Sequence, residues 1–225
     1  LFLFTGAADA VTYSNAPTAF GWIDPATHTN VTWTSGASCS AAYAGAPVDD
    51  DITAQIPLGF TFNFGGVNYT TVQIMSNGRL QFNNGYCGFG TQATGPPRTY
   101  PLPYPDANLV RTMKVYGADL DASPTGTGTT CPAANCYVRY ATLGTAPNRS
   151  FVVTWTGVPE WSAGGSFFNL QVILQENGDF IFQYGASNNP SLGKAQIGWE
   201  VNTTDYGLYT FANIGSLANT AVRFY

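Results

Sequence analysis

The sequence predicts an all-β protein, a single-domain antiparallel β-sandwich with long loops and minimal helix over residues 1–225. Three observations lead to this fold class. Apolar and polar residues alternate in several runs, with the period of two that marks a half-buried strand. Gly-Gly and Asn-Gly pairs separate these runs, and such pairs are typical of tight hairpin turns. The 25 Gly, 14 Pro and 15% aromatic residues also suit many short strands joined by turns.

The clearest hairpin signal lies in residues 58–82. Phenylalanines alternate with polar residues over Phe60–Phe64, so one face of this strand is apolar. Gly65–Gly66 then turns the chain, and Asn77–Gly78 turns it again between two further apolar runs. These residues predict successive antiparallel strands.

A second Asn-Gly pair, Asn177–Gly178, joins the strand candidates Phe168–Gln175 and Asp179–Tyr184. The other expected strands are Val31–Thr34, Met113–Leu120, Cys136–Thr142, Phe151–Val158, Ala195–Val201, Tyr206–Phe211 and Val222–Tyr225. Aromatic residues at alternate positions in these strands, such as Trp155, are expected in the core.

Helix is expected at one place. The proline-rich stretch Thr94–Asp106 cannot join the middle of a sheet, because proline lacks a backbone N–H donor. Asp106 is a suitable cap for one short helical turn over Ala107–Met113.

Charge and hydropathy argue against two kinds of partner. Only 9% of residues are charged, and the net charge is −5. Nucleic-acid binding needs a basic surface, so no nucleic-acid partner is expected. The sequence has no run of eighteen apolar residues, so no transmembrane segment is expected. Uncharged polar residues must cover the surface, a composition typical of secreted or cell-surface proteins.

The four cysteines indicate an oxidising compartment. Cys131 and Cys136 form a close pair in one loop, whereas Cys39 and Cys87 lie in separate turn-rich segments. Of the three pairings that four cysteines allow, the simplest joins the close pair to each other and the distant pair to each other. The longer bridge would contribute about 4 kcal/mol to stability. A zinc site is the alternative, but the spacing is unusual for zinc and the chain has a single histidine. Disulfides, and with them an extracellular or cell-surface location, are expected.

An ordered series of motifs runs through the chain. It opens with Phe-Asn-Phe-Gly-Gly-Val-Asn-Tyr at residues 62–69 and Ser-Asn-Gly-Arg-Leu-Gln-Phe at residues 76–82. It continues with Gly117–Asp121, Tyr137–Tyr140, Phe151–Val158, Phe168–Leu174, Asn177–Gly178 and Gln183–Gly185. This series resembles nidogen-like (NIDO) extracellular domains, most strongly over residues 56–200. It is also similar to the surface domain of bacterial MSHA pilus-biogenesis proteins of the Q type.

The resemblance implies a non-catalytic extracellular adhesion or surface-assembly module, associated with a pilus or the cell surface. Its partner would be a surface protein or a glycan. The family supplies no active-site motif to carry over. The resemblance says little about residues 1–50 and 85–106, and scaffolds vary in their loops, so a specific ligand is expected to bind there.

The residues themselves also argue against an enzyme. His28 is the one histidine, and the chain lacks a Gly-x-Ser-x-Gly nucleophile motif. Glycosidases need two carboxylates across a cleft, and Glu160 beside Trp161 offers one. An extracellular hydrolase is the alternative that a second carboxylate near Glu160 would favour.

Two acidic clusters are candidates for a metal site, with Ca²⁺ as the candidate cofactor. Asp119 and Asp121 alternate, so on a strand their carboxylates share one face and could provide the oxygen ligands that Ca²⁺ prefers. Asp49–Asp51 is a second cluster, in a flexible polar segment. The competing interpretations are a strand end whose carboxylates accept loop amides and an ordinary solvated turn. A calcium site would favour a calcium-assisted carbohydrate-binding, lectin-like domain.

Loop aromatics are candidates for contact with a ligand. Trp161, Tyr100 and Tyr104 lie in Gly- or Pro-rich loops, where an exposed ring can stack on a sugar face or a partner. The alternative is that each ring packs beneath its own loop.

The N-terminus suggests a further function. Its first four residues, Leu1, Phe2, Leu3 and Phe4, are all apolar, which fits a strand buried on both faces. Thr5–Asp9 is small enough to act as a hinge. The strand could complete its own sandwich or add to the open edge of a neighbour, which would make the chain a fibre subunit that binds copies of itself.

Overall fold

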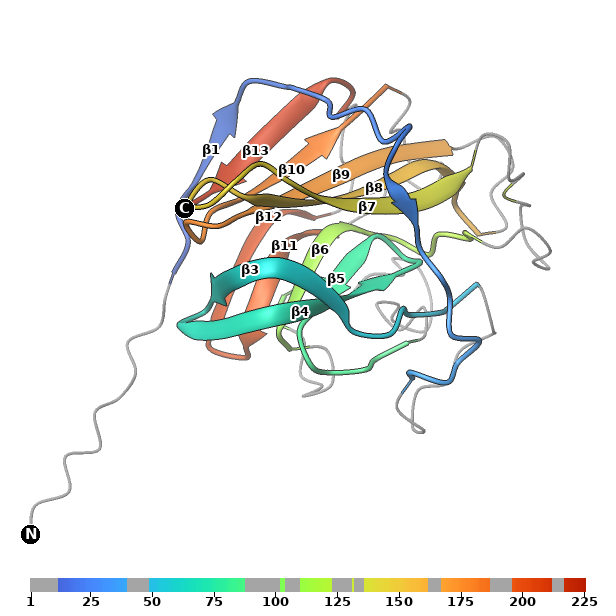
Figure 1. The fold of residues 1–225 in the computed structure, drawn as a ribbon, viewed down its shortest axis with the longest axis horizontal. Helices are drawn as coiled ribbons and strands as arrows, with labels where there is room; N and C mark the ends of the chain where they lie inside the picture. The colour runs from blue at the N-terminus through green and yellow to red at the C-terminus, as the bar shows by residue number, and fades with distance from the viewer. Residues whose placement is uncertain are drawn as a thin grey trace, which may run out of the picture.

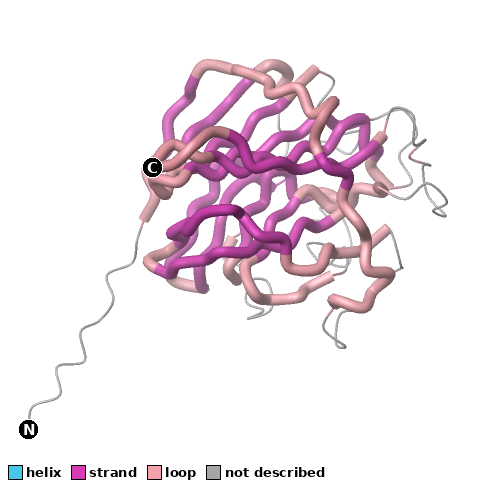
Figure 2. The backbone as a smooth tube through the Cα atoms, viewed as in Figure 1, coloured by secondary structure: helices cyan, strands magenta, loops and turns pink. Residues whose placement is uncertain are grey.

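The computed structural model describes residues 12–39, 49–87, 102–103, 110–122, 131, 136–161, 167–186, 196–211 and 217–225. In these residues the strands form two antiparallel sheets that pack face to face as a β-sandwich (Figure 1). The described residues contain strands and loops and no helix (Figure 2), as the sequence predicts. None of them therefore belongs to a helix long and apolar enough to cross a membrane.

The larger sheet has the strand order β1-β13-β10-β9-β8-β7-β2. Its strands are β1 (Asn15–Thr18), β2 (Thr29–Asn30), β7 (Tyr137–Leu143), β8 (Ser150–Pro159), β9 (Phe167–Gln175), β10 (Phe180–Tyr184) and β13 (Thr220–Phe224). The smaller sheet has the order β12-β11-β6-β5-β4-β3. Its strands are β3 (Ile56–Phe64), β4 (Val67–Met75), β5 (Arg79–Gln81), β6 (Thr112–Gly117), β11 (Gln196–Asn202) and β12 (Asp205–Phe211).

The β3–β4 hairpin follows directly from its sequence. Every second residue of β3 is buried, from Ile56 through Phe64. Phe64 pairs with Val67, which leaves Gly65–Gly66 as a two-residue loop. Both glycines have positive φ, 59° and 76°, and such a backbone is strained for other residues. The alternation places the phenylalanines of β3 in the core and its polar residues in solvent.

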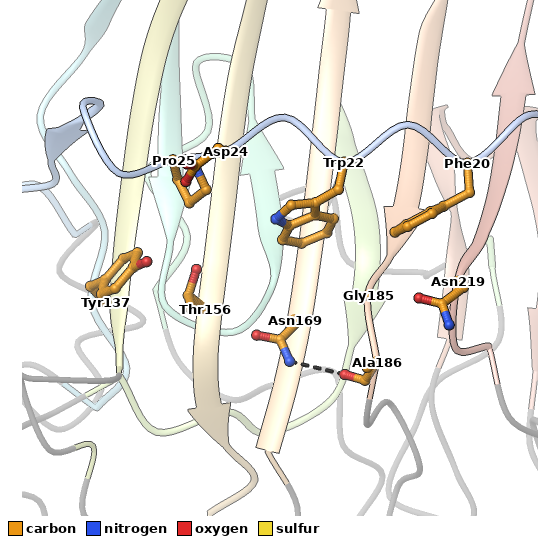
Figure 3. A pocket seen from close by; sticks show the side chains of 10 residues that line it. All are labelled: Phe20, Trp22, Asp24, Pro25, Tyr137, Thr156, Asn169, Gly185, Ala186 and Asn219. Carbon is orange, nitrogen blue, oxygen red and sulfur yellow. Dashed lines mark hydrogen bonds between the residues drawn. The ribbon is translucent and has the colours of Figure 1, made fainter.

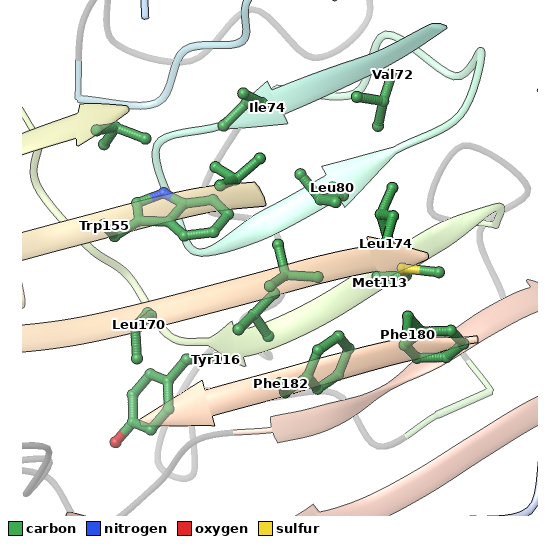
Figure 4. Close-up of a cluster of buried hydrophobic side chains, with 14 of the residues drawn as sticks. Val72, Ile74, Leu80, Met113, Tyr116, Trp155, Leu170, Leu174, Phe180 and Phe182 are labelled. Carbon is green, nitrogen blue, oxygen red and sulfur yellow. The ribbon is translucent and has the colours of Figure 1, made fainter. Parts of the chain in front are cut away.

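The core fills the space between the two sheets (Figure 4). Large side chains of the larger sheet, such as Trp155 and Phe182, meet Ile74, Leu80 and Met113 of the smaller one. Two buried polar groups also link the sheets by hydrogen bonds to backbone carbonyls. They are Trp155 Nε1 to Met75 O (3.1 Å) and Tyr184 Oη to Val115 O (2.8 Å). Each buried donor is thereby satisfied, as a packed core requires.

The helix predicted over Ala107–Met113 is wrong where the structure describes it. Strand β6 begins at Thr112, and residues 107–109 lie outside the described residues. Met113 pairs with Leu80 on one side and Trp199 on the other. Because β6 is an inner strand, hydrogen bonds to two neighbours outweigh the small preference that one capping Asp gives a helix.

Two other strand predictions need correction. In the predicted strand Val31–Thr34, Trp33 makes a single bridge, to Thr53, and the strand β2 lies just before it. Strand β6 ends at Gly117 rather than at Leu120, which makes an isolated bridge to Glu160. In both places the chain leaves its sheet earlier than its apolar pattern suggests.

The structure pairs Cys39 with Cys87 and Cys131 with Cys136, with Cα–Cα distances of 5.4 and 5.2 Å. These are the pairs expected from the sequence, so the cysteines are not zinc ligands. The other predictions for the N-terminus and the proline-rich segment concern Leu1–Phe4, Tyr100 and Tyr104, which lie outside the described residues.

Candidate functional site

A segment that we call the strap (residues 19–28) crosses the outer face of the larger sheet between β1 and β2 (Figure 1). Two glutamine side chains hold its backbone. Gln183 Oε1 accepts from the Gly21 N–H and Gln183 Nε2 donates to Gly21 O, at 2.8 and 2.9 Å. Gln171 makes the same pair of bonds with Ile23, at 3.2 and 2.9 Å.

The strap is held at this place because of the register of the sheet. Gln171 and Gln183 are directly opposite each other on β9 and β10, and Thr154 is opposite Gln171 on β8. Gln171 Nε2 donates to Thr154 Oγ1 (2.8 Å), and Gln183 Nε2 donates to Gln171 Oε1 (3.0 Å). The three side chains are buried, and their hydrogen bonds give both the sheet face and the strap polar partners.

A groove of about 380 Å³ runs alongside the strap (Figure 3). Its lining residues come from the strap and from five strands or their ends, and are Phe20, Trp22, Asp24, Pro25, Tyr137, Thr156, Asn169, Gly185, Ala186 and Asn219. Phe20 and Trp22 stack with ring centroids 6.1 Å apart. Tyr137 lies at the far side of the groove on β7, and the Arg139 guanidinium lies 4.0 Å from its ring centroid.

Polar groups lie between these rings. The Asn169 amide is fixed by the backbone, since its Nδ2 donates to Ala186 O (2.9 Å) and its Oδ1 accepts from Gly157 N (3.1 Å). Thr156 Oγ1 is buried and has no hydrogen-bond partner among the described residues. Asp24 and Asn219 are exposed at the rim. Aromatic faces with fixed amide, hydroxyl and carboxylate groups can bind a ligand that has both apolar faces and hydroxyls.

The residues predicted to bind metal lie at a different place, next to the β4–β5 turn. The Asp119 carboxylate lies with those of Asp49 and Asp50, with oxygens within 4.8 Å of one another. Asp121 is fully buried nearby, and its charge, like that of the other two, raises the pKa of Asp49. The two acidic clusters that the sequence separates by about 70 residues therefore form one site.

The interpretation of Asp49–Asp51 as a solvated turn is wrong. The three side chains are 9%, 3% and 0% exposed. Asp51 is buried because its carboxylate accepts the Ser35 N–H (2.7 Å), the Gly36 N–H (3.3 Å) and the Thr34 hydroxyl (3.2 Å). Burial, followed by the charges of neighbouring carboxylates, raises the pKa of Asp49 to about 8.

Trp161 lies beside this acidic cluster and not in the groove. Its backbone N–H donates to the backbone carbonyl of Asp119 at 2.8 Å, and its side chain is half-buried. Glu160 is buried, at 3% exposed, and its charge contributes to the raised pKa of Tyr116, after the larger effect of burial. Glu160 and Trp161 therefore do not line the groove beside the strap, and a ligand contact at Trp161 stays a prediction.

The outer face of the smaller sheet has its own buried polar layer. Arg79 and Lys114 are directly opposite each other on β5 and β6, and with Glu200 on β11 they are 0% exposed. Lys114 Nζ donates to Gln196 Oε1 at 2.6 Å. Burial, with repulsion from Arg79, lowers the pKa of Lys114 to about 7. Burial lowers the pKa of Arg79 to about 10.

Sequence reasoning missed the groove residues Phe20, Trp22 and Tyr137. One signal was present: Phe20 and Trp22 are aromatic residues in a segment without strand alternation, where a core position is not expected. Tyr137 gave no such signal, because it belongs to a predicted strand.

The comparisons with known proteins identify a family for this chain. A family model described as "NIDO related" matches residues 24–222, which extends beyond the segment of strongest resemblance and includes the second half of the strap. No curated protein and no solved structure matched the chain. The family and the two disulfides are consistent with an extracellular, oxidising environment. With a match over most of its length and a two-sheet β-sandwich, the chain belongs to the NIDO-related family.

Proposed function

We propose that this domain is a non-catalytic extracellular adhesion module that binds a glycan in the groove beside the strap. The observation that carries the proposal is the groove itself, where Trp22, Phe20 and Tyr137 lie beside polar groups. Sugars present C–H faces that pack on aromatic rings, and hydroxyls that hydrogen-bond to amides and carboxylates. The resemblance to surface proteins linked to pilus biogenesis supports a place on a cell surface.

Two features support a role without catalysis. His28 lies at the end of the strap, and the charged groups that act on its pKa are Asp24 and Arg139, neither of which is a hydroxyl or thiol that a histidine could activate. Burial lowers the pKa of His28. Glu160, the carboxylate that a hydrolase would use, is buried and does not line the groove. A binding module needs neither residue in a reactive position.

The test is a glycan array probed with the full chain, with and without a chelator. Trp22→Ala and Tyr137→Ala should each lower the affinity for the glycan that binds best by at least about tenfold, since aromatic anchors dominate binding energy. Asp24→Asn tests whether the Asp24 carboxylate contacts the glycan, because asparagine has nearly the same size and keeps the packing of the side chain. Asp24 Oδ1 accepts from Ala26 N (2.9 Å), and an amide oxygen can replace it in that turn.

Tyr206→Ala is the matched control, because Tyr206 is 39% exposed on β12 of the other sheet. It should bind as the unchanged chain does. A groove variant that melts at the normal temperature and binds its glycan normally would place the ligand elsewhere. An array without any bound glycan would overturn the glycan assignment, and the strand-exchange fibre would then be tested by deleting Leu1–Phe4.

A further inference from the structure

The acidic cluster is assembled by three separate segments at one end of the sandwich. Asp49 and Asp50 precede β3, Asn77 lies in the β4–β5 turn, and Asp119 follows β6. The Asn77 side chain joins the other two segments. Its Nδ2 donates to Asp50 Oδ1 (2.7 Å), and its Oδ1 accepts from Leu120 N (2.9 Å). One amide therefore fixes both acidic segments relative to each other.

The spacing of the carboxylates fits a single hard cation. The oxygens of Asp49, Asp50 and Asp119 lie within 4.8 Å of one another. Two oxygens that bind the same Ca²⁺ are at most about 5 Å apart, because each Ca–O distance is 2.3–2.6 Å. The three carboxylates can therefore reach one ion together.

One carboxyl group of the cluster has a buried oxygen that lacks a hydrogen bond to any described residue. Asp49 is nine-tenths buried, and its Oδ1 has no hydrogen-bond partner among the described residues. Asp50 and Asp121 are also buried, and Arg79 is the guanidinium that interacts electrostatically with Asp50 and Asp119. A buried carboxyl oxygen without a hydrogen bond is destabilising, and a bound cation would satisfy it.

Asp51 belongs to a different arrangement. Its oxygens lie near the sulfurs of Cys39 and Cys87, but both cysteines are in a disulfide and cannot serve as thiolate ligands. Its carboxylate already accepts the amides of Ser35 and Gly36. Asp51 therefore serves as a structural control in the same loop.

We infer that Asp49, Asp50 and Asp119 bind one Ca²⁺ ion, with Asp121 adding negative charge beside it. Ca²⁺ fits this site better than Mg²⁺, because Mg²⁺ demands near-ideal octahedral geometry and keeps several waters. The ion would join the loop before β3 to the segment after β6 and so stabilise one end of the sandwich. This inference does not depend on the glycan proposal, since its measurements contain no glycan.

The test uses the full chain, freed of metal with EDTA and then dialysed. Isothermal titration calorimetry with CaCl₂ should give one site per chain. Scanning calorimetry should show a melting temperature about 5 °C or more higher in saturating Ca²⁺. The absence of heat and of a melting shift at millimolar Ca²⁺ would overturn the inference, as would tighter binding of Mg²⁺.

Asp49→Asn separates a metal site from a structural cluster. Without Ca²⁺ this variant should melt higher than the unchanged chain, because a neutral amide replaces a carboxyl group that is buried beside other carboxyl groups, and it should lose the response to Ca²⁺. Asp119→Asn should behave in the same way and replaces it if Asp49→Asn does not fold. Asp51→Asn should melt lower yet keep the Ca²⁺ response. A full Ca²⁺ response in both Asp49→Asn and Asp119→Asn would refute the assignment.

Discussion

The outer faces of the two sheets both bury polar side chains, but the two faces bury side chains of different kinds. Each carries buried polar side chains at positions where strand alternation alone would place them in solvent. On the larger sheet these are neutral amides, Gln171 and Gln183, that exchange hydrogen bonds with the strap. On the smaller sheet they include the charges of Arg79, Lys114 and Glu200. Neutral amides are satisfied by pairing, whereas buried charges also bear a desolvation penalty that shifts their pKa values.

The largest effect is expected at the charged face. Arg79→Met, measured by urea unfolding in EDTA, should lower the free energy of unfolding by about 3–5 kcal/mol. The substitution removes the guanidinium that lies 5.4 Å from the Tyr86 ring centroid and interacts with Asp50 and Asp119. The control is Arg223→Met, because Arg223 is 46% exposed in its ion pair with Asp179 and should contribute at most about 1 kcal/mol. Equal losses in the free energy of unfolding at the two arginines would show that burial of the charge does not determine its contribution to stability.

The neutral face should respond less. Gln171→Leu leaves both backbone groups of Ile23 and the Thr154 hydroxyl without that partner, so a loss of about 2–3 kcal/mol is expected. Hydrogen exchange should speed up at the Ile23 amide, whereas the core amide of Val172 should be little affected. Gln175→Leu, at the end of the same strand, should change stability by no more than about 0.5 kcal/mol. Unchanged exchange at Ile23 would mean that the strap is held by other contacts.

A pH titration sharpens the comparison at Lys114. Unfolded Lys114 keeps its proton to about 10.5, but the folded residue releases it at about 7. Between these values the unfolded chain binds more protons, so stability rises with pH; below 7 the destabilisation is complete and constant. Relative to Lys114→Met, the chain should gain up to about 1.4 kcal/mol per pH unit from pH 7.5 to 9.5. The difference in stability between Gln171→Leu and the unchanged chain should not depend on pH, because Gln171 and Gln183 do not titrate.

Much of the fold could be predicted because its signals are local. Alternation over β3, the glycines at Gly65–Gly66 and the pair Asn177–Gly178 each specify strand or turn within a few residues. The predicted helix at Met113 was wrong for the opposite reason. Its local cap signal competed with pairing to Leu80 and Trp199, which lie far away in the sequence.

The sequence by itself determined the β-sandwich class, the hairpins, the likeness to nidogen-like domains and the acidic residues worth testing. Only the tertiary structure decided which of them meet. Asp49 and Asp119 are distant in the chain, and they converge because β3 and β6 belong to one sheet with the Asn77 turn between their loops. Alternation and turn chemistry act over a few residues, whereas the order of strands, and with it the partner of each loop, depends on how the whole core packs.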